Sequence, residues 1–490
     1  MSPVLPALVL MLLPLAAAGG VDDLPDIGSS AGAVISPSEE YQIGRMIMRG
    51  LRDSDRILDD PETNEYIQAI GNNLVSFATH DGQRFHFFVV RDTQINAFAL
   101  PGGFIGVNVG LILETGNESE LASVLAHEIA HVTQKHIARQ LEAAGRANLV
   151  SAAAALAAVV VGVATGSADA AQAGIMASQG AAIQSQINFT RAHEYEADRV
   201  GIKIVSEAGF DPRGMAAFFE VLSQRARLSP SLLPELLRTH PVNVARISEA
   251  QDRAAALPAA TTQNSRGYAL AKARLITQTA ESPAKALEHF RRQAGKDEVN
   301  AAETNRYGLA LAYAAAGDYA QSAEIFRSLK NRHEQVTEYH IGLAQALLWS
   351  HQDKQALAAF ETAIGLFPRN IPLTIRYSQA LMQTGQPGRA HDLLLDLLNN
   401  TDPTPDQVRL LALAASATGN TGDAHYYMSE VHILNGELRL ALDQLKLASY
   451  TPNISAIQRD RYQARTEEIQ EALAKQKKKR RVSQDKDDRQ

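Results

Sequence analysis

Cysteine is absent from all 490 residues of the chain. Disulfide bonds, thiolate catalysis, zinc sites with cysteine ligands and lipid attachment to cysteine are therefore excluded. The chain also lacks a strong charge of either sign, because 54 acidic residues oppose 47 basic ones and leave a net charge of −7. This balance gives no reason to expect a nucleic acid as partner. The chain is too long for one ordinary hydrophobic core, which predicts two or more domains.

Lysine and arginine are missing before the apolar run at the amino terminus, Val4–Leu15. The run is too short to cross a bilayer comfortably. It is followed by three alanines at 16–18, and small residues in this place are typical of a signal-peptide cleavage site. We therefore expect residues 1–20 to be a signal peptide, which in a bacterium directs the mature chain to the periplasm. A buried N-terminal helix is the alternative.

One long run without any charge covers residues 149–166. Its eighteen residues reach the length at which a membrane span must be considered, but the run is rich in alanine and only weakly lipophilic. A second stretch of small residues follows at 170–182. We expect 149–182 to form a helical hairpin that packs against the protein or contacts a membrane surface peripherally. A true span at 149–166 is the alternative.

The remaining pattern before residue 258 is mostly helical. A helix is predicted from Ser38, with two glutamates in its first turn. Residues 85–113 are rich in β-branched and aromatic side chains and are interrupted by Pro-Gly-Gly at 101–103, which predicts two or three short strands. A further helix is predicted to run to about Leu141. The fold class is therefore mainly α with a small β-sheet.

The stretch LASVLAHEIAHVTQKH, residues 121–136, carries the strongest chemical signal. Four residues on a helix turn by about 400°, so His127 and His131 share one face and can each give a ring nitrogen to one Zn²⁺. Glu128 lies about 100° away, off the metal but within reach of a water bound to it. The pattern His-Glu-x-x-His thus predicts a metal-dependent hydrolase. A polar patch on a helix is the alternative.

A catalytic zinc needs a third protein ligand and one open position. Glu194 and Asp198 are again four residues apart, so both can face the first helix. We expect Glu194 to be the third ligand and Asp198 to accept the ring N–H of a ligand histidine. Helix geometry alone does not eliminate His193 or Glu196, for which a solvent-facing position is preferred. His136 is expected to point away from the metal.

After Pro258 the sequence repeats with a period of 34 residues, and a segment at 286–290 and another at 426–448 suggest further copies. Small residues at fixed offsets let paired helices approach, and a column of large apolar residues fills the gap between pairs. This period resembles the tetratricopeptide repeat. The matched columns are Gly308, Gly342 and Arg376; Gly317, His351, Gly385 and Gly419; Ser322, Ala356, Ala390 and Ala424; and Phe326, Phe360, Leu394 and Met428.

Three motifs together resemble the membrane-associated gluzincin peptidases, the family of zinc metallopeptidases that includes the CAAX-processing prenyl protease. They are LAHEIAHVTQKH, EYEADRVG with its Glu-x-x-x-Asp spacing, and RTHPVNVARI at 238–247. The resemblance agrees that Glu194 is the third ligand of a single Zn²⁺. It implies that His240 approaches the zinc, where it occupies the fourth position at rest or stabilises the oxygen of the tetrahedral intermediate. It also implies that Arg246 supports the site electrostatically.

The predicted organisation is a gluzincin-type metallopeptidase domain at 21–258, an α-solenoid of tetratricopeptide repeats at 266–475 and a charged, disordered tail at 476–490. Contact of the tail with anionic lipid or RNA is its alternative role. Because cysteine is absent, the two domains are expected to dock by packing alone. The strand region is expected to bind substrate as an added strand, with Asn96 either touching the peptide or serving as a turn or cap residue.

With a signal peptide before the peptidase and repeats after it, the resemblance implies a periplasmic metalloendopeptidase of outer-membrane protein assembly and quality control. Its partners are expected to be unfolded or misfolded outer-membrane proteins and the outer-membrane β-barrel assembly machinery, bound through the repeats, with possible chaperone activity. Two other classes stay open. One is a repeat scaffold or chaperone whose zinc site is held shut by His240, and the other is an integral-membrane protease that uses 149–166 as a span.

Overall fold

The computed structural model describes residues 36–80, 82–143, 181–228, 234–258, 260, 263–293 and 299–487. The predicted signal peptide, the uncharged run 149–166 and most of the small-residue stretch that follows it lie outside these residues. Among the residues that the structure describes, no helix is long and apolar enough to cross a membrane.

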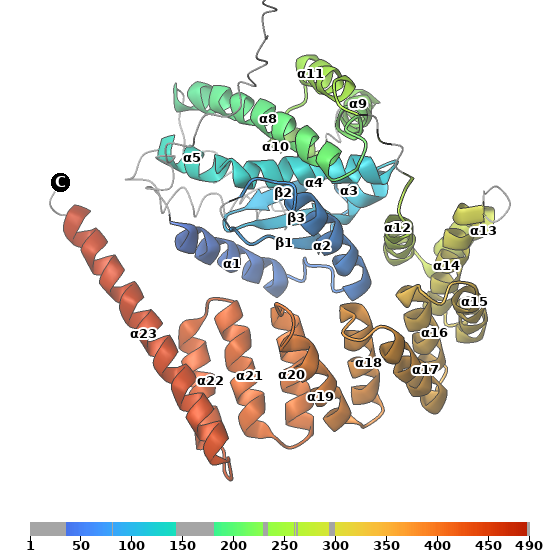
Figure 1. Cartoon of the computed structure of the whole chain (residues 1–490), viewed down its shortest axis with the longest axis vertical. Coiled ribbons are helices and arrows are strands. Elements are labelled where there is room, and N and C mark those ends of the chain that lie inside the picture. The colour runs from blue at the N-terminus through green and yellow to red at the C-terminus, as the bar shows by residue number, and fades with distance from the viewer. Residues whose placement is uncertain are drawn as a thin grey trace, which may run out of the picture.

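The amino-terminal half combines helices with one small sheet (Figure 1). The first helix begins at Pro37 with Ser36 as its N-cap, two residues before the predicted cap. The elements are α1 (Pro37–Asp53), α2 (Pro61–Val75), β1 (His86–Val90), β2 (Ala97–Leu100), β3 (Phe104–Asn108), α3 (Val109–Glu114), α4 (Glu118–Thr133), α5 (His136–Ala143), α8 (Ala181–Glu207), α9 (Gly214–Leu228), α10 (Glu235–Thr239) and α11 (Val244–Ala255).

The three strands lie in the order β1-β3-β2, which confirms the short strands predicted for 85–113. β1 pairs parallel with β3, and β2 pairs antiparallel with it. The outer edge of β1 is covered, because the N–H of Leu58 donates to the carbonyl of Val89 at 2.9 Å. β2 is the other edge strand and lies beside α4. Helix α10 lies beside the start of β2, because the N–H of Leu236 donates to the carbonyl of Ile95 at 3.1 Å.

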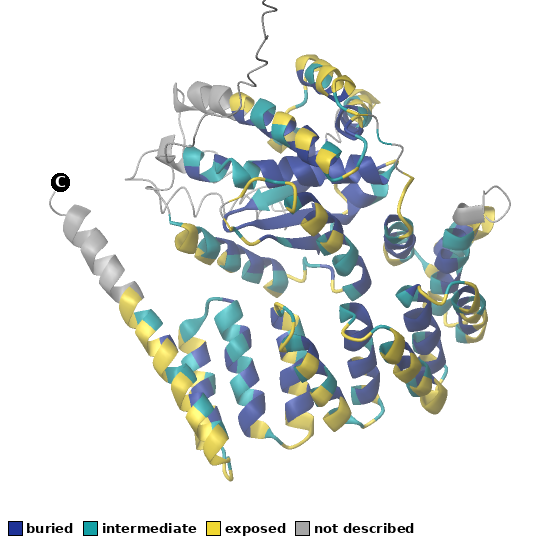
Figure 2. Ribbon diagram, in the orientation of Figure 1, coloured by how far each residue is buried: buried dark blue, intermediate teal, exposed yellow. Residues whose placement is uncertain are grey.

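Helix α4 is the centre of this half. Every residue from Glu118 to Ala130 is buried, and α4 packs against α2, α8, α9 and β2. Figure 2 shows α4 and most of the strands in the colour of buried residues. Gly201 of α8 lies so close to α4 that a Cβ there would be 3.1 Å from the backbone nitrogen of His127. This glycine brings α8 near enough for its side chains to reach those of α4.

The continuous helix predicted to about Leu141 is wrong. α4 ends at Thr133, Lys135 takes a left-handed backbone conformation with a φ of 54°, and α5 begins at His136. Lysine gives no sequence signal for such a break, because glycine or asparagine is the usual residue at a positive φ. The break turns His136 back toward α4 instead of carrying it round a continuous helix.

The carboxyl-terminal half is a row of paired helices, which confirms the predicted mainly α fold with a repeat solenoid. Figure 1 shows the row curving below α1 and α2. The helices are α12 (Arg266–Thr279), α13 (Pro283–Gln293), α14 (Val299–Ala315), α15 (Tyr319–Arg332), α16 (Thr337–Trp349), α17 (Asp353–Leu366), α18 (Ile371–Gln383), α19 (Pro387–Leu398), α20 (Pro405–Ala417), α21 (Thr421–Leu434), α22 (Leu438–Tyr450) and α23 (Ala456–Asp487).

The columns of the 34-residue period have structural causes. A Cβ at Gly308 would lie 2.1 Å from the ring of Phe290, and one at Gly342 would lie 2.4 Å from the ring of Phe326, so only glycine fits. The turn column has positive φ at every member, including a φ of 58° at His351 where the other repeats have glycine. The residues at these positions therefore give successive repeats the same kind of turn and the same close helix crossing.

The two halves are joined by helix α12 and by a buried ion cluster. Tyr268 and Leu275 of α12 lie in the core of the amino-terminal half, whereas Leu270 and Ala273 lie in the core of the repeats. Asp60, at the N-cap of α2, accepts hydrogen bonds from Arg274 at 2.9 Å and from Arg376 of α18 at 3.1 Å. Docking by packing alone is therefore wrong, because buried charges also connect the halves.

Arg376 occupies the position of the 34-residue column that glycine holds in the two preceding repeats. Its guanidinium also donates to Glu62 at 2.8 Å. Near the end of the solenoid, Arg45 donates to the carbonyl of Ile433 at 2.7 Å, and Arg49 pairs with Glu437 at 3.1 Å. The repeats thus contact α1 and α2 at two separate places.

The predicted tail overlaps helix α23 at residues 476–487, because α23 continues through Asp487. Residues 456–487 contain neither proline nor glycine and are rich in lysine, arginine, glutamine, glutamate and alanine. All of these have high helix propensity, so a polar helix extends beyond the packed repeats.

Candidate metal centre

Four side chains from three parts of the chain meet beside α4. His127 and His131 come from α4, Glu194 comes from α8, and His240 follows directly after α10. One ligand atom from each lies within 4.8 Å of the other three. The Nε2 atoms of His127 and His131 are 3.0 Å apart, and Nδ1 of His240 is 3.3 Å from Nε2 of His127.

The chemistry of this cluster suits a divalent cation. Oxygens of the Glu194 carboxylate lie 3.5 Å from Nε2 of both His127 and His131. Two imidazole nitrogens and one carboxylate oxygen, all converging on one point, form the ligand set typical of catalytic zinc sites. The sequence predicted these three residues as ligands, and the structure brings them together with His240.

His127 is supported from behind by Asp198 and Arg246. Nδ1 of His127 lies 3.0 Å from Oδ1 of Asp198, which leaves its Nε2 facing the cluster. Arg246 donates two hydrogen bonds to Asp198, at 2.7 and 2.8 Å, and lies 3.0 Å from Glu194. All of these side chains are buried, so the carboxylates keep their places by charge-assisted hydrogen bonds.

The electrostatics of the cluster favour positive charge at its centre. Burial opposes a proton on His127, but Asp198 and Glu194 outweigh it and raise the pKa of His127 to about 10. Burial also opposes ionisation of Glu194, yet His240 and His127 hold the pKa of that carboxyl well below its usual range. A proton and a metal cation compete for the same nitrogen, so binding of a metal releases protons from this site.

His131 has a different support. Its Nδ1 lies 2.8 Å from Nδ1 of His136, and Nε2 of His136 lies 3.1 Å from the carboxylate of Glu196. Arg139 donates to the same carboxylate at 2.9 Å. Burial lowers the pKa of both His131 and His136.

The predicted solvent-facing positions of His193 and Glu196 are wrong. His193 is only 1% exposed, and its ring stacks on that of His136 with centroids 4.1 Å apart. Glu196 is half-buried and bound to His136 and Arg139. The reason is the helix break at Lys135, which the sequence did not reveal and which brings α5 against α8.

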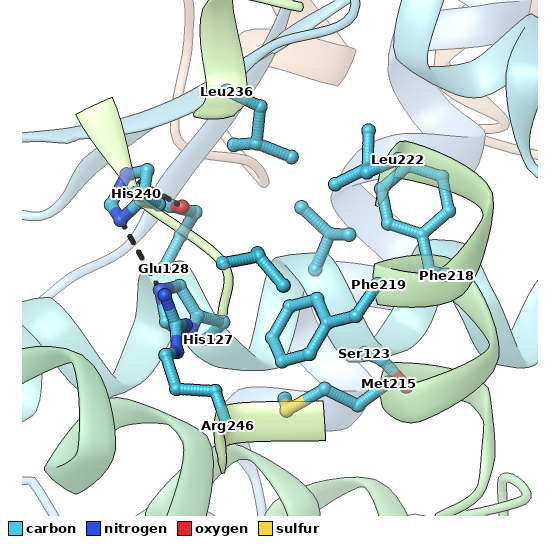
Figure 3. A pocket seen from close by; sticks show the side chains of 12 residues that line it. Ser123, His127, Glu128, Met215, Phe218, Phe219, Leu222, Leu236, His240 and Arg246 are labelled. Carbon is cyan, nitrogen blue, oxygen red and sulfur yellow. Dashed lines mark hydrogen bonds and ion pairs between the residues drawn. The ribbon is translucent and has the colours of Figure 1, made fainter. Parts of the chain in front are cut away.

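Glu128 lies next to the cluster but outside it. It is 1% exposed, and its Oε1 lies 3.6 Å from Nε2 of His240. A cavity of about 20 Å³ adjoins the pair. Figure 3 shows His127, Glu128, His240 and Arg246 on one side of this cavity and the apolar side chains of α9, with Leu236, on the other. A carboxylate in this place can exchange a proton with a group bound beside the metal ligands.

Asn96, the residue predicted either to touch a peptide or to serve as a turn or cap residue, lies directly before β2 and is 3% exposed. Its carbonyl accepts a hydrogen bond from the N–H of Asn108 at 3.0 Å. Its backbone thus extends the pairing of β2 with β3 at the end of the sheet next to α10.

Comparisons with known proteins agree with this architecture. The model of peptidase family M48 matches residues 61–254, and a tetratricopeptide-repeat model matches residues 347–414. A β-barrel assembly-enhancing protease of Escherichia coli is 33% identical over 458 residues, which cover 93% of this chain and 92% of that protein. A putative β-barrel assembly-enhancing protease of Vibrio cholerae is also 33% identical, with 93% and 94% covered.

The chain belongs to peptidase family M48. The metalloprotease LoiP of Escherichia coli is 30% identical over 203 residues, which cover 40% of this chain and 73% of that protein. The chain is accordingly a metalloendopeptidase that carries tetratricopeptide repeats after its peptidase half. The family is metal-dependent, and the cluster beside α4 is a group of residues that could hold the metal.

Proposed function

We propose that this M48 peptidase is a zinc-dependent endopeptidase of the bacterial periplasm, which acts in outer-membrane protein assembly and degrades misfolded outer-membrane proteins. The observation that carries the proposal is the convergence of His127, His131 and Glu194 with Glu128 beside them. The likeness to β-barrel assembly-enhancing proteases over nearly the whole chain supports the biological setting. The apolar amino terminus followed by alanines supports export.

In this proposal His127, His131 and Glu194 hold one Zn²⁺. When bound, the metal supplies a Lewis acid for the peptide carbonyl and lowers the pKa of water to about 7. Glu128 accepts the proton of the attacking water and returns it to the leaving amine, a role for which its buried carboxylate is placed beside the ligands. Asp198 holds His127 in the tautomer whose Nε2 lone pair faces the cluster.

His240 belongs to the resting form of the site. Its Nδ1 lies 3.0 Å from Glu194 and 3.3 Å from His127, which is the place where a fourth ligand would approach. In the proposal His240 moves aside when a substrate enters and then donates a hydrogen bond to the oxygen of the tetrahedral intermediate. The substrate adds to the edge strand β2, which lies beside α4.

The repeats provide the surface for clients and for the assembly machinery. A cavity of about 830 Å³ lies between the peptidase half and the repeats, large enough for several residues of an extended chain. Aromatic side chains of β1 line one wall, and α18 and α20 of the repeats line the other. The lining mixes apolar side chains such as Phe87 and Ile375 with charged ones such as Arg52 and Asp406, which suits the alternating apolar and polar side chains of an unfolded β-barrel strand.

The test is cleavage of a chemically unfolded outer-membrane β-barrel protein by the mature chain loaded with Zn²⁺. Glu128→Gln is expected to lower kcat/KM about 10²- to 10⁴-fold, the usual contribution of a general base, while zinc content stays unchanged. Glu120→Gln is the matched control, because Glu120 is a buried glutamate of the same helix whose carboxylate accepts hydrogen bonds from Gly116 and Asn117 and lies outside the cluster of four.

A second function, a repeat-based scaffold or chaperone with a self-inhibited site, is favoured by the place of His240 in the cluster. His240→Ala separates the two. Under the protease proposal the wild-type chain cleaves the unfolded protein, and His240→Ala still cleaves it but with a lower kcat, because the hydrogen bond that His240 donates to the tetrahedral intermediate is lost. If wild type and His240→Ala both bind the unfolded protein and neither cuts it, the scaffold function holds and the protease proposal fails.

A further inference from the structure

The two histidines of α4 are held by different partners. Behind His127 stands a carboxylate, Asp198, at 3.0 Å. Behind His131 stands a third imidazole, that of His136, at 2.8 Å between the two Nδ1 atoms. The hydrogen-bond chain behind His131 therefore contains one more imidazole ring. It ends at the carboxylate of Glu196, 3.1 Å from Nε2 of His136.

We propose that His136 is a positioning residue for the metal ligand His131, and that Glu196 acts through it. The inference rests on the proposed metal site. It goes beyond that site because His136 contributes no ligand atom to the cluster of four.

The hydrogen bonds allow one consistent set of tautomers. Nε2 of His131 faces the cluster, so its proton must be on Nδ1, which donates to Nδ1 of His136. His136 can accept there only if its own proton is on Nε2, and this N–H donates to the Glu196 carboxylate. A carboxylate at the end of the chain thus fixes the protons of two rings in succession.

The ring of His136 is also fixed in orientation. It is 2% exposed and stacks on His193 with an interplanar angle of 8°. Arg139, one turn further along α5, holds Glu196 by a 2.9 Å hydrogen bond. The left-handed residue Lys135 places His136 at the first position of α5, facing back toward His131.

Metal affinity measures this role directly. Loss of such an outer partner of a ligand histidine typically weakens metal binding about 10- to 100-fold. His136→Leu replaces the imidazole with an apolar side chain of similar length, which offers no hydrogen-bond acceptor to His131. His136→Asn places an amide oxygen near the position of Nδ1 and can still accept the hydrogen bond.

The experiment is a competition for Zn²⁺ between the full mature chain and a chromophoric chelator, with the absorption spectrum of the Co²⁺-substituted chain as a second readout. His136→Leu is expected to bind Zn²⁺ about 10- to 100-fold more weakly and to alter the Co²⁺ spectrum. His136→Asn is expected to restore much of the affinity and the wild-type spectrum. A wild-type affinity and spectrum in His136→Leu would overturn the inference.

His340→Leu is the matched control for a merely structural effect. His340 is a buried histidine of the repeat helix α16, 5% exposed, whose Nε2 bonds the carbonyl of Glu334 at 2.9 Å. This variant is expected to lower stability without changing Zn²⁺ affinity or the Co²⁺ spectrum. If it weakens Zn²⁺ binding as much as His136→Leu does, the effect of His136 is structural and the inference fails.

Glu196→Gln and the double variant with His136→Leu test the order of the chain. If Glu196 acts through His136, the double variant binds Zn²⁺ no more weakly than His136→Leu alone. Additive losses would contradict that order. A wild-type chain that binds no Zn²⁺ at all would instead refute the proposed metal site, so the two failures are distinguishable.

Discussion

The peptidase half and the repeat half of this chain use buried side chains in opposite ways. In the cluster beside α4 the buried groups are polar, and His127 lies 3.0 Å from Asp198 and 3.5 Å from Glu194. In the repeats most buried groups are small or apolar, and the same fit of glycine against phenylalanine occurs at successive repeats. A change in the first region should alter chemistry, and a change in the second should alter stability alone.

The contact between the two halves combines both regions, because it buries charged side chains of the repeats. Asp60 and Glu62 of the peptidase half meet Arg274 and Arg376 of the repeats in a buried ion cluster. Arg376 stands where the repeat column has glycine, so a break in the period marks the place where the solenoid contacts its neighbour. The stability of the two halves is therefore coupled through charges and not only through apolar area.

The largest change in the free energy of unfolding is expected from Asp60→Asn. Removing one member of a buried ion cluster leaves Arg274 and Arg376 without full compensation, which costs about 3–5 kcal/mol. Urea unfolding of the full chain measures the loss. Asp53→Asn, which removes an exposed partner of Arg49, is the control and should change the free energy of unfolding by about 0.5 kcal/mol or less. Equal effects of the two variants would show that the cluster contributes no special stability.

The same cluster predicts a dependence on pH. Burial opposes ionisation of Asp60, but Arg274 and Arg376 outweigh it and lower its pKa in the folded chain. A carboxyl with a lowered folded pKa stabilises fully above its unfolded pKa of about 3.9, and the stability is lost as the pH falls below that value toward the folded pKa. The difference in Tm between wild type and Asp60→Asn should therefore shrink from pH 6 to pH 3. A difference that stays constant would contradict this assignment.

A smaller loss is expected from overpacking the repeats. The added methyl group of Gly342→Ala would lie 2.4 Å from the ring of Phe326, and such overpacking typically costs about 1–3 kcal/mol. Zinc content and cleavage should stay at the wild-type level. Gly365→Ala is the matched control, since no atom lies within 4 Å of its added methyl group and alanine favours a helix. If Gly342→Ala were as stable as Gly365→Ala, the close crossing of α15 and α16 would not be required.

The smallest effect is expected at the turn column. His351 has a φ of 58°, a conformation that costs a residue with a side chain roughly 1–2 kcal/mol relative to glycine. His351→Gly should therefore raise Tm slightly, with part of the gain offset by the greater freedom of glycine in the unfolded chain. The reverse exchange, Gly385→His, should lower Tm by a similar amount. An opposite sign in both variants would show that backbone strain does not govern this column.

The fold was largely readable from the sequence because both halves obey simple periods. The helical face of His127 and His131 and the 34-residue columns depend on spacing alone, and the three strands depend on composition. The ion cluster at Asp60 was not predictable, because it joins residues more than 200 positions apart. The support of His131 was missed for a local reason, since Lys135 breaks the helix at a residue that carries no break signal.

The metal site is tested most directly by anomalous diffraction at the zinc absorption edge, from crystals of the purified mature chain. If His127, His131 and Glu194 hold the zinc, one peak is expected about 2.0–2.2 Å from Nε2 of His127, Nε2 of His131 and a carboxylate oxygen of Glu194. Crystals soaked in excess zinc that show no peak among these three groups, or a single peak on other residues, would contradict this assignment.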